Sequence, residues 1–153
     1  MLCRYLLADG RDAEIDLIDE AETLALRLAV LRPGKAAADL TPRAAGSLIL
    51  GARMARRLVA TLCVSPLAEP GRNVTGQWRL LGMATEESCR GLGIGGALLD
   101  TAVALLTERD DAAWLWCDGR VEAASFYLRH GFHRIGEIRS DSGPHLRFRR
   151  AIF

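Results

Sequence analysis

The sequence predicts a mixed α/β (α+β) fold in which helices pack on a β-sheet. Short apolar runs, typical of strands, alternate with longer amphipathic segments, typical of helices. Their order is strands, helix, strands, helix, strand, helix and strands, which predicts a mixed sheet with helices packed on it. No repeat, low-complexity tract or clear linker interrupts the 153 residues, so we expect a single domain spanning residues 1–153.

The N-terminal half is expected to contain four strands and one main helix. Asp19 can cap a helix from Glu20 to Leu31, because its side chain can accept a hydrogen bond from a free N–H of the first turn. Pro33-Gly34 would then end this helix. The alanine-rich stretch 35–45 is the least predictable part and could hold a short helix. The strands are expected at residues 2–7, 14–18, 47–54 and 58–64, with turns at 8–12 and 55–57 and a Pro- and Gly-rich loop at 65–76.

The C-terminal half is expected to alternate strands and helices. Trp78 to Thr85 is a strand-like run, and Gly95 to Glu108 has the spacing of apolar residues that one helix face requires. A second helix is expected from Glu122 to His130 and would end at Gly131-Phe132. The remaining strands are expected at residues 112–117, 134–139 and 145–153, with the last two joined by a turn at 140–144.

Composition and charge exclude several classes of protein. A net charge of +1 gives no overall field that would favour nucleic acid or an anionic membrane as partner. No apolar run is long enough to span a bilayer and the N-terminus lacks a secretory signal, so we expect a soluble, cytoplasmic protein. The basic cluster Arg147-Phe148-Arg149-Arg150 alternates with Leu146. We interpret it as an edge strand with a charged solvent face rather than as a nucleic-acid patch.

The four cysteines do not predict a metal site. Cys3, Cys63, Cys89 and Cys117 form no CxxC pair and no His/Cys cluster at zinc-ligand spacing, so no metal is expected. Cys63 and Cys117 lie in apolar strand-like runs, where a free cysteine behaves as a small hydrophobic residue.

The most informative segment is a glycine-rich stretch that opens the first C-terminal helix. Glycines at 91, 93, 95 and 96 follow Arg90 and leave several backbone N–H groups free to point at one place. These donors and the positive end of the helix dipole together suit a phosphate or pyrophosphate. The spacing does not match the dinucleotide fingerprint, and a Walker A loop would need a lysine, whereas the chain has one lysine, Lys35, elsewhere.

Two motifs resemble those of the GNAT superfamily of acyl-CoA-dependent N-acyltransferases, and they follow each other along the chain in the same order as in that family. Arg90-Gly91-Leu92-Gly93-Ile94-Gly95 is similar to the Arg-x-x-Gly-x-Gly pyrophosphate loop of that family. The segment from Ala123 to Phe132 is similar to its A-x-x-h-Y-x-x-x-G-F pattern, with Tyr127 at the tyrosine. The strong motifs cover residues 78–132, and weaker similarity covers most of the rest.

The resemblance implies a fold and a cosubstrate site. The fold would be a twisted, mostly antiparallel sheet of about six or seven strands flanked by helices, with a central parallel pair that splays apart. Acetyl-CoA would be the cosubstrate, and Gly82 would help to form a bulge in the first splayed strand. The main chain of Met83, Ala84 and Thr85 would meet the pantetheine arm. The pyrophosphate would be bound by Arg90, Gly91, Leu92, Gly93, Ile94, Gly95 and Gly96.

The same resemblance implies that Tyr127 is catalytic, because a nearby phenol can protonate the departing thiolate. Arg120 stands where many relatives have an asparagine that contacts pantetheine; arginine offers donors but no acceptor, so its contact would differ in kind. The strand 78–85 lacks the glutamate that many relatives use as a base. Asp118, Glu86, His145 and a water chain are alternatives, and the base is left open.

The expected activity is transfer of an acetyl group from acetyl-CoA to a primary amine of a small molecule or peptide by direct attack in a ternary complex. The alternative mechanism is a covalent intermediate, in which Cys117 is acylated before the amine attacks. The alternatives for the protein are a non-catalytic acyl-CoA sensor on the same fold, or another nucleotide-binding α/β protein. The resemblance places the acceptor between the first helix with its following loop and the 139–145 connection, whose mixed charges leave the acceptor open. The strand from Leu146 to Phe153 could pair across a homodimer.

Overall fold

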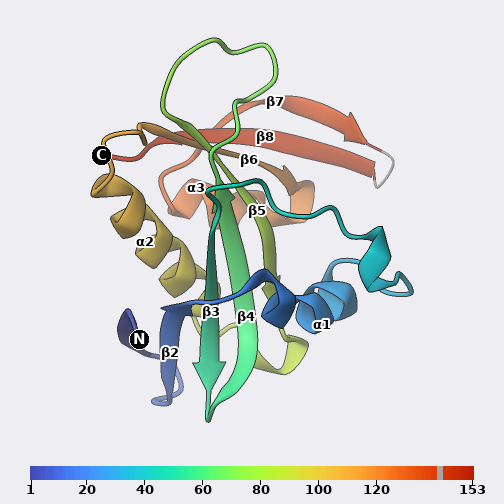
Figure 1. Cartoon of the computed structure of the whole chain (residues 1–153), viewed down its shortest axis with the longest axis vertical. Coiled ribbons are helices and arrows are strands. Elements are labelled where there is room, and N and C mark those ends of the chain that lie inside the picture. The colour runs from blue at the N-terminus through green and yellow to red at the C-terminus, as the bar shows by residue number, and fades with distance from the viewer. Residues whose placement is uncertain (141–142) are drawn as a thin grey trace.

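A computed structural model describes residues 1–140 and 143–153 and contains an eight-stranded sheet with helices packed on it (Figure 1). The strand order is β1-β2-β3-β4-β5-β6-β8-β7, and β5–β6 is the parallel pair among otherwise antiparallel neighbours in the described residues. This confirms the mixed fold, and the sheet has the eight strands that the residue patterns predict, where the family resemblance implied about six or seven. The strands are β1 (Cys3–Leu6), β2 (Asp12–Leu17), β3 (Leu48–Met54), β4 (Arg57–Ser65), β5 (Gln77–Thr85), β6 (Trp114–Arg120), β7 (His133–Ser140) and β8 (Gly143–Ala151).

In the part of the chain that the structure describes, three α-helices and three short 3₁₀ turns connect these strands. The helices are α1 (Glu20–Val30), α2 (Ile94–Thr107) and α3 (Ala124–Arg129), and the turns are η1 (Ala37–Asp39), η2 (Glu87–Cys89) and η3 (Val121–Ala123). The helix expected over 122–130 therefore starts as a 3₁₀ turn and becomes α-helical at Ala124. The turn expected at 140–144 contains Asp141 and Ser142, which lie outside the described residues. No helix in the described part of the chain is long and apolar enough to cross a membrane.

Helix α1 begins where the sequence predicts it. The backbone N–H of Asp19 donates to Glu22 Oε2 at 2.9 Å, so the residue before the helix and one in its first turn are tied together. Glu20 and Glu22 both lie in that first turn, where negative charge is favourable next to the helix dipole. The helix ends at Val30, before Pro33.

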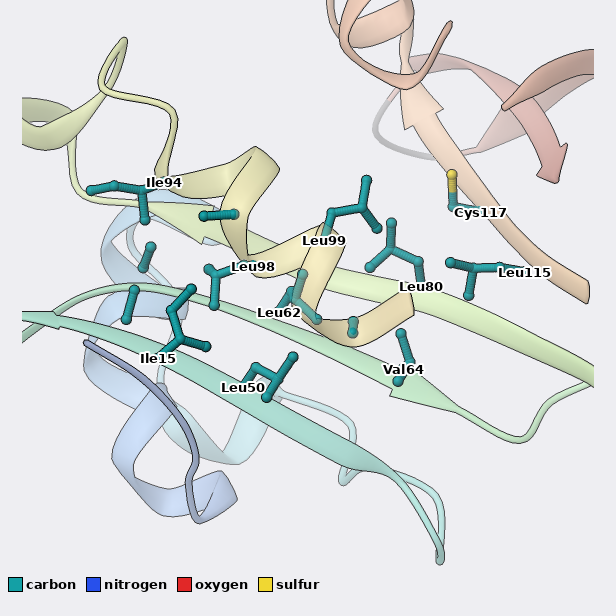
Figure 2. Close-up of a cluster of buried hydrophobic side chains, with 14 of the residues drawn as sticks. Ile15, Leu50, Leu62, Val64, Leu80, Ile94, Leu98, Leu99, Leu115 and Cys117 are labelled. Carbon is teal, nitrogen blue, oxygen red and sulfur yellow. The ribbon is translucent and has the colours of Figure 1, made fainter. Parts of the chain in front are cut away.

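The main core lies between α2 and one face of the sheet (Figure 2). Leu98 and Leu99 of α2 are fully buried against alternate residues of the central strands, including Leu62 and Leu80. Alternation along β4 sends Leu62 and Val64 to this face and Thr61 and Cys63 to the other. The second face, which α1 covers at β4 and β5, is therefore the more polar one.

Strand β8 is an interior strand, so the edge-strand prediction for the Arg147–Arg150 segment was wrong. β8 pairs with β6 on one side and with β7 on the other, and β7 forms the edge. Its charged face is satisfied inside the protein, because Arg147 pairs with Asp118 and Arg149 with Glu69. Since both edges of β8 are occupied, this strand offers no free edge to a second copy. A homodimer remains a prediction that needs another surface.

The Pro- and Gly-rich segment between β4 and β5 is held down by polar contacts. Arg149 Nη2 donates to Glu69 Oε1 at 2.9 Å, and the Glu69 backbone N–H donates to Gln77 Oε1 at 2.9 Å. Trp116 Nε1 also donates to the Leu67 carbonyl at 2.8 Å. The loop is therefore held against the first part of β6 and the last part of β8.

We predict that Glu69→Ala lowers the free energy of unfolding by about 1–3 kcal/mol, because it leaves the partly buried Arg149 guanidinium without its carboxylate. Chemical denaturation measures the change. The control is Glu137→Ala, which removes an exposed carboxylate that also pairs with an arginine, Arg134. Equal losses in both variants would contradict a special role for the buried pair.

Candidate functional site

The parallel strands β5 and β6 separate after a short stretch of pairing. Their ladder contains Gln77–Trp114, Trp78–Leu115 and Arg79–Trp116 and then stops, although β5 continues to Thr85 and β6 to Arg120. The predicted splay is confirmed. The later main-chain groups of β5 are thus left without partners on the β6 side.

Gly82 forms the predicted bulge in β5. It has a φ of +67°, and the β4–β5 register shifts between Thr61 and Cys63, directly opposite. Beyond the bulge, the side chain of Ala84 is buried, Met83 lines one cavity and Thr85 lines another. The three residues predicted to meet pantetheine through their main chain therefore lie along the separated part of β5.

The glycine-rich segment surrounds the smaller cavity, of about 480 Å³. Gly93, with a φ of +89°, is the residue that precedes α2, and no side chain caps the first turn. The first N–H groups of α2 are consequently available to a ligand. The lining includes Thr85, Arg90, Gly91, Gly93, Gly95 and Gly96.

The two apolar residues of the segment behave differently. The Ile94 side chain is buried, although the residue borders the cavity, and Leu92 packs against the core. The Leu92 carbonyl accepts a hydrogen bond from the Ala8 N–H at 3.2 Å. Leu92 and Ile94 are therefore anchors of the loop rather than side chains that face the cavity.

The glycines of this segment are required for different reasons. Gly93 adopts a left-handed conformation in open space, which L residues rarely adopt. At Gly96, a Cβ would come within 2.9 Å of His130 Cε1, so this glycine permits α3 to pack on α2. A Cβ at Gly95 would make ordinary contacts with Met83 and Phe126. Gly91, with a φ of +77°, is constrained in the same way as Gly93. Of the four glycines, Gly95 is therefore the one that the fold of the free protein does not require.

A larger cavity of about 1270 Å³ adjoins the smaller one at Arg90, which lines both. The Arg90 Nε donates to the Thr85 carbonyl at 3.2 Å, so this side chain is held at the end of β5. The larger cavity lies among α1 and the segment that follows it, the separated part of β5, the end of β6, and α3. Its lining includes Gly82, Met83, Arg120, Tyr127 and His145.

Tyr127 faces the larger cavity from α3. Its ring packs on Gly119, where a Cβ would overlap it, and against Phe148, with ring centroids 5.0 Å apart. Burial raises the pKa of the Tyr127 hydroxyl, so the phenol keeps its proton at neutral pH. Within the described residues, no hydrogen bond involves the Tyr127 hydroxyl. A donor is therefore available on the cavity wall.

The candidate bases differ in their availability. The two oxygens of Asp118 accept from Arg147 at 2.7 and 2.9 Å, and Glu86 pairs with Arg57. His145 lines the larger cavity, with its Nδ1 3.0 Å from the Gly143 carbonyl oxygen. Both carboxylates are thus committed to arginines, whereas His145 lines the same cavity as Tyr127.

Cys117 does not face either cavity. The residue is 1% exposed and belongs to the buried core cluster, at the edge of which Figure 2 shows it. Burial raises the pKa of its thiol, which disfavours the nucleophilic thiolate. Among the residues that the structure describes, no group of His, Cys, Asp or Glu side chains is arranged to hold a metal ion.

Comparison with known proteins gives consistent results at the level of sequence and fold. Residues 45–134, more than half of the chain, match the family described as "Acetyltransferase (GNAT) domain". The uncharacterized N-acetyltransferase YitI of Bacillus subtilis (strain 168) is 29% identical over 127 residues, which cover 81% of this chain and 85% of that protein.

Solved structures resemble the whole fold. Ard1 from Thermoplasma volcanium superimposes with a TM-score of 0.73 at 21% identity, covering 92% of this chain and 98% of that one. An aminoglycoside 6′-N-acetyltransferase complexed with coenzyme A gives a TM-score of 0.73 at 15% identity, and the match covers 92% of this chain and 97% of that one. Together with the family match, the splayed pair and the glycine segment at the start of α2, these likenesses identify the chain as a member of the GNAT acetyltransferase family.

Proposed function

We propose that this protein transfers an acetyl group from acetyl-CoA to a primary amine of a small molecule or peptide, within a ternary complex. One observation carries the proposal. A cavity lined by free N–H groups at the start of α2 adjoins a larger cavity that contains a protonated phenol and the unpaired side of β5. These are the features that a phosphate-bearing thioester and a second substrate require.

The residues around the two cavities fit coenzyme A. The main-chain N–H groups of residues 91–96 and the charge of Arg90 would hold the pyrophosphate, with Leu92 and Ile94 contributing through the backbone alone. The main chain of Met83, Ala84 and Thr85 would pair with the pantetheine amides, since this stretch of β5 has no partner on the β6 side. Arg120 borders the larger cavity and would donate to the same arm. The bound thioester supplies the activated acetyl group.

Tyr127 would act on the leaving group. Because burial keeps the phenol protonated, it can donate a hydrogen bond to the sulfur as negative charge develops there. The raised pKa also makes Tyr127 a weaker acid. Stabilisation of the developing thiolate by hydrogen bonding would therefore account for more of its effect than complete proton transfer.

Direct attack by the amine is favoured over a covalent enzyme intermediate. Cys117, the cysteine on the splayed strand, is buried on the core side of the sheet. The amine must lose a proton before attack, and His145 or a water beside it would accept that proton.

Release of free thiol across a panel of primary amines tests this proposal against a sensor of acyl-CoA. An enzyme releases CoA thiol in proportion to an added amine, whereas a sensor binds acetyl-CoA without turnover. Calorimetric titration with acetyl-CoA, with ATP and NAD as controls, separates both from another nucleotide-binding protein. Tight binding of ATP or NAD without acetyl-CoA would overturn the proposal.

We predict that Gly93→Ala weakens acetyl-CoA binding by about tenfold or more, because a left-handed alanine costs about 1–2 kcal/mol and shifts the N–H groups of the loop. Isothermal titration measures the dissociation constant. Gly71→Ala is the matched control: its φ of +79° and open surroundings resemble those of Gly93, but it lies in the loop before β5. Equal dissociation constants for acetyl-CoA in the two variants would mean that the glycine-rich segment is not part of the binding site.

We predict that Tyr127→Phe lowers kcat by about 10- to 150-fold, the loss expected when one hydrogen bond of about 1.5–3 kcal/mol to a developing charge is removed, while acetyl-CoA affinity is retained. Steady-state thiol release gives kcat. In the parent protein, the raised pKa of the phenol means that Tyr127 should cause no alkaline decline of kcat below about pH 10. Full turnover by Tyr127→Phe would exclude the acid role.

A further inference from the structure

The larger cavity is strongly cationic, although the whole chain carries a net charge of only +1. Two carboxylates, Asp39 and Asp118, line it. The cationic side chains that line it are Arg27, Arg32, Lys35, Arg43, Arg79, Arg90 and Arg120. The sequence shows these charges as scattered, and the fold brings them to one place.

Arg43 presents a guanidinium without an ion-pair partner in the described residues. Its backbone N–H is held by both carboxylate oxygens of Glu20, at 3.2 Å each, which fixes the segment after α1. The guanidinium lies against Gly82, where a Cβ would overlap it. Burial, and then the positive charges of Arg27 and Arg79, lower the pKa of Arg43. These charges repel one another, and an anion between them would relieve the repulsion.

The Arg79 guanidinium also has a hydrogen-bond donor that the described part of the protein does not satisfy. Its Nε is buried without a hydrogen-bond partner among the described residues. Its Nη2 lies 3.8 Å from Asp118, a carboxylate whose oxygens already accept from Arg147. The guanidinium is held over the ring of Trp116, 4.8 Å from its centroid. Arg79 is therefore positioned by stacking and retains donors for another group.

The phosphates of coenzyme A do not account for these two arginines. Arg90 lines both cavities, whereas Arg43 and Arg79 line only the larger one, away from the free N–H groups at the start of α2. Arg43 contacts Gly82, which directly precedes Met83 on the separated part of β5. The guanidiniums are thus on the side of the cavity where an acceptor would approach the thioester.

We infer that the acceptor amine carries an anionic oxygen group, a carboxylate or a phosphate, which binds between Arg43 and Arg79. The inference rests on the proposed acetyl transfer and narrows its substrate class. Charge-assisted hydrogen bonds from two guanidiniums would orient the acceptor with its amine toward the thioester, and the same charges would repel polycationic amines.

Matched acceptors test this inference. Glycine is compared with glycinamide, phosphoethanolamine with ethanolamine, and spermidine serves as a polycation. Thiol release should give a kcat/KM at least about tenfold higher for the anionic member of one pair, the factor expected from a charge-assisted hydrogen bond. The preferred pair distinguishes carboxylate from phosphate. Equal or better use of glycinamide, ethanolamine or spermidine would overturn the inference and leave acetyl transfer intact.

Two variants test whether Arg43 and Arg79 cause the preference for an anionic acceptor. Arg43→Gln and Arg79→Gln should each raise KM for the anionic acceptor about tenfold or more, with the dissociation constant of acetyl-CoA unchanged. Arg134→Gln, at an exposed ion pair on β7, is the matched control. An unchanged KM for the anionic acceptor in both variants would contradict binding of its anionic group between Arg43 and Arg79. Failure of the parent protein to bind acetyl-CoA would instead reject the proposed function.

An equilibrium measurement covers the case in which these amines are too small to react. The CoA-saturated protein should be stabilised against heat by N-acetylglycine or by inorganic phosphate, but not by N-acetylglycinamide. The increase in melting temperature that these anions cause should disappear in the Arg43→Gln and Arg79→Gln variants. Absence of stabilisation by either anion would overturn the inference.

Discussion

The separation of β5 from β6 is the constraint on which the rest of the structure depends. A sheet that remained paired through Thr85 and Arg120 would have no interior gap, and neither the main chain of β5 nor the α3 tyrosine would face a cavity. Leaving backbone groups without partners inside a protein costs about 1–3 kcal/mol each, so the gap must admit water or a ligand. The bulge at Gly82 turns β5 away, and the pairing of β6 with β8 keeps β6 in place.

Arginine has two distinct roles around this gap, and how closely a carboxylate pairs with the guanidinium decides between them. Arg147 and Arg149 pair with Asp118 and Glu69, and the hydrogen bonds to Asp118 raise the pKa of Arg147. These pairs join β8 to β6 and to the loop before β5. Arg43, by contrast, has a lowered pKa and no ion-pair partner in the described residues. The closely paired arginines support the sheet. Arg43, together with Arg79, whose contact with Asp118 is 3.8 Å long, contributes to the charge of the cavity.

Much of the fold and half of the candidate site follow from local sequence. Asp19 and Pro33 bound α1, alternation marks the strands, and the glycine segment marks the start of α2, because each depends on residues that are near in the chain. The edge position of β8 was predicted wrongly, since a strand with one charged face alternates in the same way whether that face meets water or buried carboxylates. Arg43 was missed because it lies in an alanine-rich segment without a periodic pattern.

The sequence by itself determined the family motifs, the order of helices and strands, and the position of Tyr127 on a helix that follows the second splayed strand. Only the tertiary structure decided which charges meet. Arg43 and Arg79 are 36 positions apart in the chain, yet they line one cavity, because the segment after α1 crosses the bulge of β5. It also decided that Cys117 faces the core. Strand periodicity states that neighbouring residues face opposite ways, but which face meets α2 and which meets the cavity depends on packing between distant segments.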